Sequence, residues 1–116
     1  MSGTNAEGKV KNIEKAQVLK LAEKIDFADG EVVSLTLVQD PNCRMTLFAI
    51  DGGEGLSSHS APGDALVQVL VGSVEVTISD VPHTLHAGEA IVIPSGASHA
   101  LHALEPFKML LTVVPD

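Results

Sequence analysis

Histidine is the residue type with the most chemistry to offer in this chain of 116 residues. The five histidines are His59, His83, His86, His99 and His102. A neutral imidazole can ligate a divalent transition metal, and histidine exchanges a proton near neutral pH, so metal binding, acid–base catalysis and ligand binding are all open to these side chains. The single cysteine, Cys43, lies in a predicted turn and is expected to be a free surface thiol rather than a nucleophile. No Ser-His-Asp arrangement, P-loop or G-x-G-x-x-G motif is present.

The composition excludes several classes of function. The chain has 15 Asp and Glu against 7 Lys and Arg, and this net charge of −8 argues against binding to a nucleic-acid backbone. With no Trp, no Tyr and 3 Phe, a platform for stacking bases is not expected either. The N-terminus lacks the apolar stretch of a signal peptide, and no apolar run approaches the ~20 residues that span a bilayer. We expect a soluble cytoplasmic protein that binds neither nucleic acid nor a membrane.

The elements that would position the histidines are short strands. From Asp29-Gly30 onward apolar and polar residues alternate, and Gly, Pro and Asp separate the runs. The runs are Glu31–Val38, Met45–Ile50, Ala65–Val71, Ser73–Ser79, His83–His86, Ala90–Ile93, Ala100–Ala103 and Phe107–Val114. Such a series predicts an all-β sandwich or barrel in one domain. Residues 1–12 predict a flexible tail, and residues 13–25 fit both helical and strand spacing.

Two stretches carry glycine, histidine and proline at the spacing of two known motifs. The first motif, G-x5-H-x-H-x3-E-x6-G, falls on residues 53–72 at Gly53, His59, Ala61, Ala65 and Gly72. The second motif, G-x5-P-x-G-x2-H-x3-N, falls on residues 88–103 at Gly88, Pro94, Gly96, His99 and Ala103. On these residues the chain resembles the cupin superfamily, and in particular small, single-domain bacterial cupins. The resemblance implies an RmlC-like jelly roll, which is a β-barrel, over residues 13–116, with residues 16–25 mostly extended.

The resemblance also implies a metal site, from which this chain departs. In metal-binding cupins three His and one Glu hold a divalent ion such as Fe, Mn, Ni or Zn, and open positions on the ion admit substrate. This chain keeps His59 and His99 of that set, whereas Ala61 and Ala65 occupy the other two positions. Two imidazoles alone would hold a metal weakly, because a catalytic site normally has three protein ligands.

A third metal ligand could come from elsewhere in the chain. His83 shares its strand parity with Leu85 and could point into the barrel, and Asp64 could bend inward because Pro62-Gly63 precedes it. His86 and His102 are expected to face solvent. A divalent metal on His59 and His99 therefore stays open as a cofactor, with its third ligand unassigned.

The barrel interior indicates which residues would bind a ligand. Alternate positions point inward, so Leu101 shares a face with His99, and Val67 shares one with Ala65. The predicted ligand-binding residues are His59, Ala61, Ala65, Val67, His99 and Leu101. Ala61 and Ala65 stand where the first motif has His and Glu, so they make the pocket larger and less charged. Such a pocket would accept a small, mostly apolar or carboxylated molecule. Two alternatives are a dioxygenase- or isomerase-like enzyme using a metal on His59 and His99, and a structural homodimer without chemistry. No catalytic residue is assigned.

Several strands are apolar on both faces, most clearly Leu66–Val71 and Met109–Leu111. A barrel of this size cannot bury both faces of these strands by itself, so the outward faces need cover. A homodimer is the expected solution, since closed two-fold assemblies are the commonest oligomers. The N-terminal segment could also provide cover by burying Val18, Leu19 and Leu21.

Overall fold

The computed structural model describes residues 8–116, which form nine strands and one short 3-10 helix. The helix is η2 (Leu21–Lys24), and the strands are β1 (Val32–Asp40), β2 (Cys43–Ile50), β3 (Gly55–His59), β4 (Asp64–Val71), β5 (Ser73–Ile78), β6 (Val81–His86), β7 (Ala90–Ile93), β8 (His99–Ala103) and β9 (Phe107–Val114). The all-β prediction is confirmed, and every predicted run overlaps a strand. Within residues 8–116 no helix is long and apolar enough to cross a membrane.

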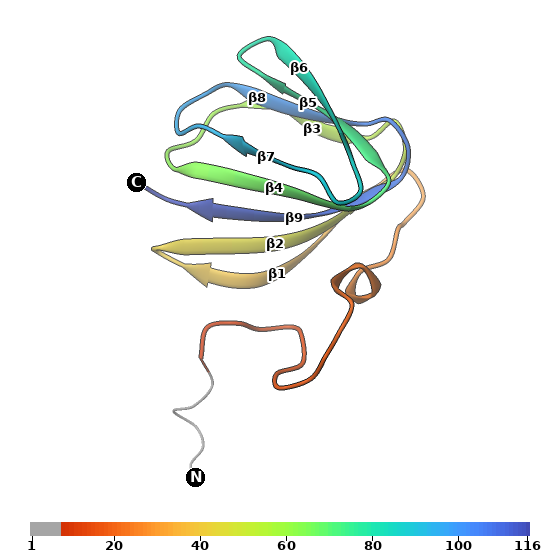
Figure 1. Ribbon diagram of the computed structural model, residues 1–116, viewed down its shortest axis with the longest axis vertical. Coiled ribbons are helices and arrows are strands. Elements are labelled where there is room, and N and C mark those ends of the chain that lie inside the picture. Colours follow the sequence, from red (N-terminus) through yellow and green to blue (C-terminus); the bar gives the residue numbers. More distant parts are fainter. Residues whose placement is uncertain (1–7) are drawn as a thin grey trace.

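The strands form two antiparallel sheets that face each other (Figure 1). The five-stranded sheet has the order β1-β2-β9-β4-β7, and the four-stranded sheet has the order β3-β8-β5-β6. The hairpins β1-β2 and β5-β6 each stay within one sheet, but every other connection crosses from one sheet to the other. Each sheet therefore combines strands that are distant in the sequence, as in a jelly roll. The expected RmlC-like jelly roll is therefore the fold of this chain.

Strand β3 is the one strand that the sequence did not predict. Its sequence, GLSSH, lacks apolar alternation, and its side chains are half-buried or exposed. It is a strand because its backbone pairs with β8, which places Leu56 opposite Leu101 and His59 opposite His99. Pairing between such distant segments leaves no local signal in the sequence.

The core lies between the two sheets. Its largest fully buried side chains are Ile50, Val67, Val74, Val76, Ile93, Phe107 and Met109. The inward parity predicted for β4 and β8 is found, because Ala65, Val67, Leu101 and Ala103 all belong to this cluster. Truncation of such a residue, as in Phe107→Ala, costs about 3–5 kcal/mol. The scaffold around the cavity is thus fixed by well-packed neighbours.

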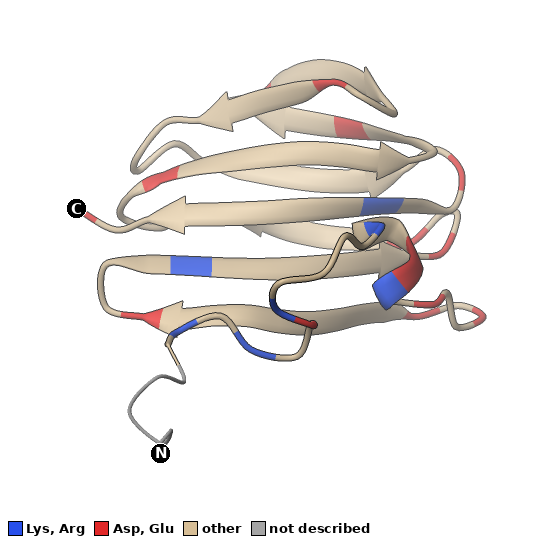
Figure 2. Ribbon diagram, turned by 60° about the horizontal axis from the view of Figure 1, so that its bottom comes forward, with Lys and Arg blue, Asp and Glu red and all other residues tan. Residues whose placement is uncertain are grey.

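The N-terminal segment covers part of the outer face of the five-stranded sheet. Figure 2 shows it crossing in front of β1 and β2. Ile13, Leu21 and Ile25 pack with Leu47 and Leu110 in a second apolar cluster on that face. The segment 16–25 was expected to be mostly extended, but residues 21–24 form η2. That turn brings Leu21 and Ile25, four positions apart, onto the same sheet face.

Polar contacts tie the same segment to the sheet. Lys108 donates from Nζ to the Ala22 carbonyl oxygen at 2.6 Å, and its Nζ lies 5.1 Å from the centre of the Phe27 ring. Of the three residues that the segment could have buried, only Leu21 packs with this cluster; Val18 is fully exposed, and Leu19 is half-buried outside the cluster. Of the predicted tail, residues 1–7 lie outside the described residues. In the remainder, the Lys11 amide donates to the Leu37 carbonyl oxygen at 2.8 Å.

Candidate functional site

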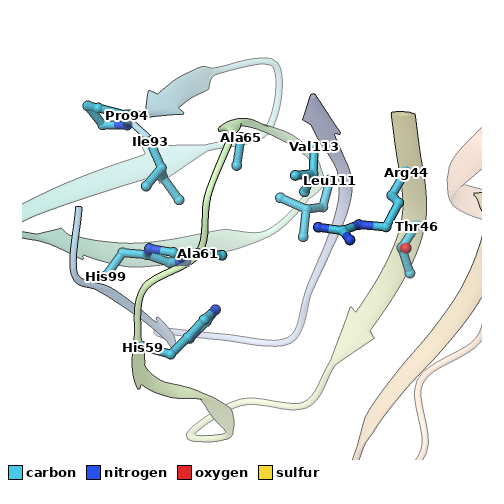
Figure 3. Close-up of a pocket in the computed structure, with 11 residues that line it drawn as sticks. Arg44, Thr46, His59, Ala61, Ala65, Ile93, Pro94, His99, Leu111 and Val113 are labelled. Atoms are coloured by element: carbon cyan, nitrogen blue, oxygen red, sulfur yellow. The ribbon is translucent and has the colours of Figure 1, made fainter. Parts of the chain in front are cut away.

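A cavity of about 240 Å³ lies between the two sheets at one end of the barrel (Figure 3). Its lining residues are Arg44, Thr46, His59, Ala61, Gly63, Ala65, Ile93, Pro94, His99, Leu111 and Val113. Most of these side chains are apolar. The polar groups come in two pairs, with Arg44 and Thr46 on β2 and the two histidines on β3 and β8.

One transverse row of the five-stranded sheet forms a wall of the cavity. Arg44, Val113, Ala65 and Ile93 are successive partners across β2, β9, β4 and β7. Residues that are directly opposite in antiparallel strands face the same side of the sheet, so all four side chains point into the barrel. In the next row inward, Thr46 and Leu111 still line the cavity, whereas their neighbour Val67 belongs to the packed core. The cavity is therefore one to two residue layers deep.

The opposite wall carries His59 and His99, which are partners across β3 and β8. Their ring centroids are 4.3 Å apart, and the ring planes are inclined at 60°. His59 Nδ1 lies 2.9 Å from the carbonyl oxygen of Ser57, and His99 Nδ1 lies 3.0 Å from that of Ala97. A carbonyl oxygen can only accept, so each Nδ1 carries the hydrogen and each Nε2 of the neutral ring keeps a free lone pair. The pair is thus held ready to bind through Nε2.

The residues around this pair do not fit the metal centre of three His and one Glu. Across residues 8–116 no group of three or more His, Cys, Asp or Glu side chains is arranged to hold a metal ion. Ala61 and Ala65 line the cavity but offer no ligand atom. Arg44 lines the same cavity, and its positive charge opposes a bound cation. The donor set therefore stops at two imidazoles.

The side chains proposed as a third ligand lie elsewhere. Asp64 is exposed, and its Oδ1 accepts a hydrogen bond from the Ser95 amide at 2.9 Å. His83 is half-buried on β6 and is not part of the cavity lining. His86 is exposed beside Glu89, with 3.3 Å between Nδ1 and Oε1, and His102 is exposed on β8.

The structure brings together four of the six predicted ligand-binding residues. His59, Ala61, Ala65 and His99 line the cavity. Val67 and Leu101 do not, because they lie deeper in the core, where they are 0% and 6% exposed. Strand parity places a side chain inside the barrel, but it does not say how far that side chain lies from the open end.

Of the lining residues that the sequence did not predict, which include Thr46, Arg44 has the most chemistry to offer. It is the second residue of β2, whereas the predicted strand began at Met45. The signal was present, because Arg44 has the same parity as Thr46, Phe48 and Ile50, which face the barrel interior. A single arginine on the inward parity of an apolar strand is informative, since charged side chains are rarely buried without a partner.

Hydrogen bonds hold the rim of the cavity. Ser95 accepts at Oγ from the Gly63 amide at 2.9 Å and donates from Oγ to Asp116 Oδ2 at 2.6 Å. The Gly96 amide donates to the carbonyl oxygen of Ala61 at 3.0 Å. These bonds join the loop before β4 to the loop after β7, so the rim is organised before any ligand binds.

Comparison with known proteins agrees with this architecture. Residues 46–114 match the family described as Cupin domain. A conserved protein of unknown function from Streptococcus pyogenes is 41% identical, with a TM-score of 0.93 over 97% of this chain and 98% of that one. A cupin superfamily protein from Desulfitobacterium hafniense is 28% identical, with a TM-score of 0.90 over 94% of this chain and 100% of that one.

The similarity to a curated protein is more restricted. Protein SchB from Streptomyces halstedii is 36% identical over 56 residues, which make up 47% of this chain and 41% of SchB. The family match is broader, because it covers more than half of the chain and includes both motifs, at residues 53–72 and 88–103. This chain therefore belongs to the cupin domain family.

Proposed function

We propose that this protein binds a small organic molecule in the cavity between its sheets, with His59 and His99 as hydrogen-bonding partners. The observation that carries the proposal is the histidine pair, whose rings lie 4.3 Å apart with both Nδ1 atoms fixed by backbone carbonyls. The free Nε2 atoms stand beside an apolar wall. A concave apolar site with a few convergent polar groups is typical of small-molecule binding.

The volume of the cavity limits the size of the ligand. The cavity has a volume of about 240 Å³. Sites for drug-sized ligands occupy ~300–1,000 Å³. The ligand is therefore the size of a small metabolite.

The histidines also define part of the ligand's chemistry. A neutral imidazole whose Nδ1 hydrogen is already used can only accept at Nε2. A ligand that satisfies both rings offers O–H or N–H donors on that side. Its remaining surface is apolar, because Ile93, Leu111 and Val113 face it.

Blocking the cavity tests this proposal. Ala65 is 8% exposed and lines the cavity, so Ala65→Leu fills part of it. Ala90→Leu is the matched control, because Ala90 is exposed at the start of β7 and is not part of the lining. A library of small acids, amides, alcohols and sugars is screened by ligand-observed NMR. We expect molecules that bind the wild type and Ala90→Leu but not Ala65→Leu; a library in which nothing shows this pattern contradicts the proposal.

A metal-dependent enzyme is the second candidate. The bonds from Nδ1 to carbonyl oxygens favour it, because metal-ligating histidines are commonly oriented in this way. The missing third ligand and Arg44 oppose it. Elemental mass spectrometry of protein purified without a chelator or a His-tag decides between the two. A first-row metal at about one per chain that is lost in His99→Ala would replace our proposal with the enzyme.

A further inference from the structure

We infer that the ligand of this cavity is a small organic acid whose carboxylate is bound by Arg44. The inference rests on the proposed function and adds the chemical class of the ligand. Of the eleven lining residues, Arg44 is the only one that is permanently charged. The chain as a whole has a net charge of −8, so the positive charge of Arg44 in this apolar cavity is opposite in sign to the charge of the protein.

Arg44 lacks a partner within the part of the chain that the structure describes. Ion pairs between described residues include those of Lys9 with Asp40, Lys24 with Glu14, and His86 with Glu89. Arg44 is half-buried and takes part in none of them. A partly desolvated guanidinium without a counter-charge is unfavourable, and a ligand carboxylate can relieve this through two parallel hydrogen bonds.

Thr46 adds a second group on the same wall. It lies two residues after Arg44 on β2, so both side chains project from the same face of the strand. Figure 3 shows the guanidinium of Arg44 directed into the cavity with Thr46 beside it. The hydroxyl of Thr46 can donate to a carboxylate oxygen that Arg44 does not saturate.

The arrangement of the walls defines a bipolar ligand. Arg44 and Thr46 lie on the five-stranded sheet, and His59 and His99 lie on the four-stranded sheet across the cavity. The first pair binds an acceptor anion, and the Nε2 atoms of the two histidines accept a hydrogen bond. A ligand that matches both has a carboxylate at one end, an apolar body, and a hydroxyl or amine at the other end.

The surroundings favour a singly charged acid. Asp64 and Asp116 both bond to Ser95, next to the lining residue Pro94. These carboxylates, together with the overall negative charge, repel a ligand that brings more charge than Arg44 can neutralise. Phosphate esters and diacids are therefore disfavoured relative to a monocarboxylate.

Matched pairs of acids and amides test the inference. The probes are para-hydroxybenzoate with para-hydroxybenzamide, and beta-hydroxybutyrate with beta-hydroxybutyramide, titrated by calorimetry or by NMR. Inorganic phosphate serves as an anion without an apolar body. Each amide keeps the shape of its acid and removes the charge. We expect each acid to bind the wild type about 10- to 100-fold more tightly than its amide, as for a hydrogen bond to a charged group.

Substitutions of Arg44 show where any preference arises. Arg44→Gln should reduce the binding of the acid to that of the amide, and Arg44→Lys should keep only part of the preference because it cannot bind in a bidentate manner. Lys20→Gln is the control, because Lys20 is exposed and its loss changes the net charge equally. Circular dichroism checks that every variant is folded.

The outcomes separate this inference from the proposed function. Equal binding of acid and amide, a preference that survives in Arg44→Gln, or phosphate binding as tight as that of the acids overturns the inference. The proposed function still stands in these cases if Ala65→Leu abolishes the binding. Neutral ligands that bind in the cavity while no acid binds also overturn the inference alone. If no molecule binds in a manner sensitive to Ala65→Leu, both fail.

Discussion

Replacing Gly63 by alanine tests how the rim of the cavity is held. Gly63 has a φ of +101°, and a Cβ at this position would lie 2.5 Å from the carbonyl oxygen of Val114. The Gly63 amide also donates to Ser95 Oγ, which fixes its place in the rim. Gly88 is a matched control, because its φ is +90° but a Cβ there meets nothing within 4 Å. Both substitutions strain the backbone, but only Gly63→Ala forces packed atoms apart.

The expected effects on stability follow from these two geometries. A left-handed backbone costs a residue with a Cβ about 1–2 kcal/mol, so Gly88→Ala should lower the free energy of unfolding by that amount. Gly63→Ala adds overpacking, which typically costs about 1–3 kcal/mol, for a total of about 2–5 kcal/mol. At about 4 °C per kcal/mol for a domain of this size, the Tm of Gly63→Ala should lie about 4–12 °C below that of Gly88→Ala.

Thermal unfolding of the two variants is followed by far-UV circular dichroism, because the chain has no Trp or Tyr for intrinsic fluorescence. Binding of para-hydroxybenzoate, measured well below both Tm values, then reports on the rim. We expect weaker binding in Gly63→Ala and unchanged binding in Gly88→Ala. Equal Tm values would refute the reasoning that the close approach of Gly63 to Val114 holds this part of the barrel.

Three further predictions address the former metal site, the pH dependence and the assembly. Ala61→His combined with Ala65→Glu should raise the amount of Ni or Zn that the protein retains after desalting toward one ion per chain. Unchanged metal content would show that these positions do not face the metal site of three His and one Glu that the motifs imply. The Gly30 amide, and then the Gly52 amide, hold the pKa of Asp51 below its usual value by donating to its carboxylate. The stabilisation from Asp51 is thus complete above its unfolded pKa of about 4 and is lost as the pH falls through the lower folded pKa. Asp51→Asn should therefore make the free energy of unfolding, measured with urea at a series of pH values, fall less steeply at acid pH. The expected homodimer stays a prediction. Val92 and Val114 are 54% and 56% exposed on the outer sheet face, outside the cluster that the N-terminal segment covers. If this face forms the dimer, Val92→Lys should give a 12.1 kDa monomer in sedimentation velocity. A monomeric wild type would contradict the prediction.

The fold was predictable from the sequence because most of its strands bury one face. Alternation of apolar and polar residues marks such strands locally, and the two glycine and proline motifs mark the turns between them. Strand β3 was not predicted, because backbone pairing with β8 rather than burial holds its polar residues in place. The N-terminal segment could have buried Val18, but that residue is exposed, and the segment reaches the sheet through Ile13, Leu21 and Ile25 instead.

The cavity was less predictable because it depends on which strands are neighbours. The row of Arg44, Val113, Ala65 and Ile93 joins four strands that are distant in the sequence, and its existence follows from the order β2-β9-β4-β7. The motifs place Ala65 and the histidines within this region, but Arg44 lies outside both motifs. Strand parity could have placed Arg44 inside the barrel, but only the order of the strands places its side chain across the cavity from the imidazole pair.

Ala65 and Arg44 both make this cavity less favourable for a cation than the metal site that the cupin motif implies. Alanine at position 65 stands where the motif has a glutamate, so the cavity loses the negative charge that would stabilise a cation. Arg44, the neighbour of Ala65 across β9 in the same transverse row, adds a positive charge. The charge that lines the cavity is thus reversed, while backbone carbonyls fix the orientation of His59 and His99. A cavity of this polarity favours an anion over a metal cation, which is why we propose that the imidazoles bind the ligand directly instead of through an ion.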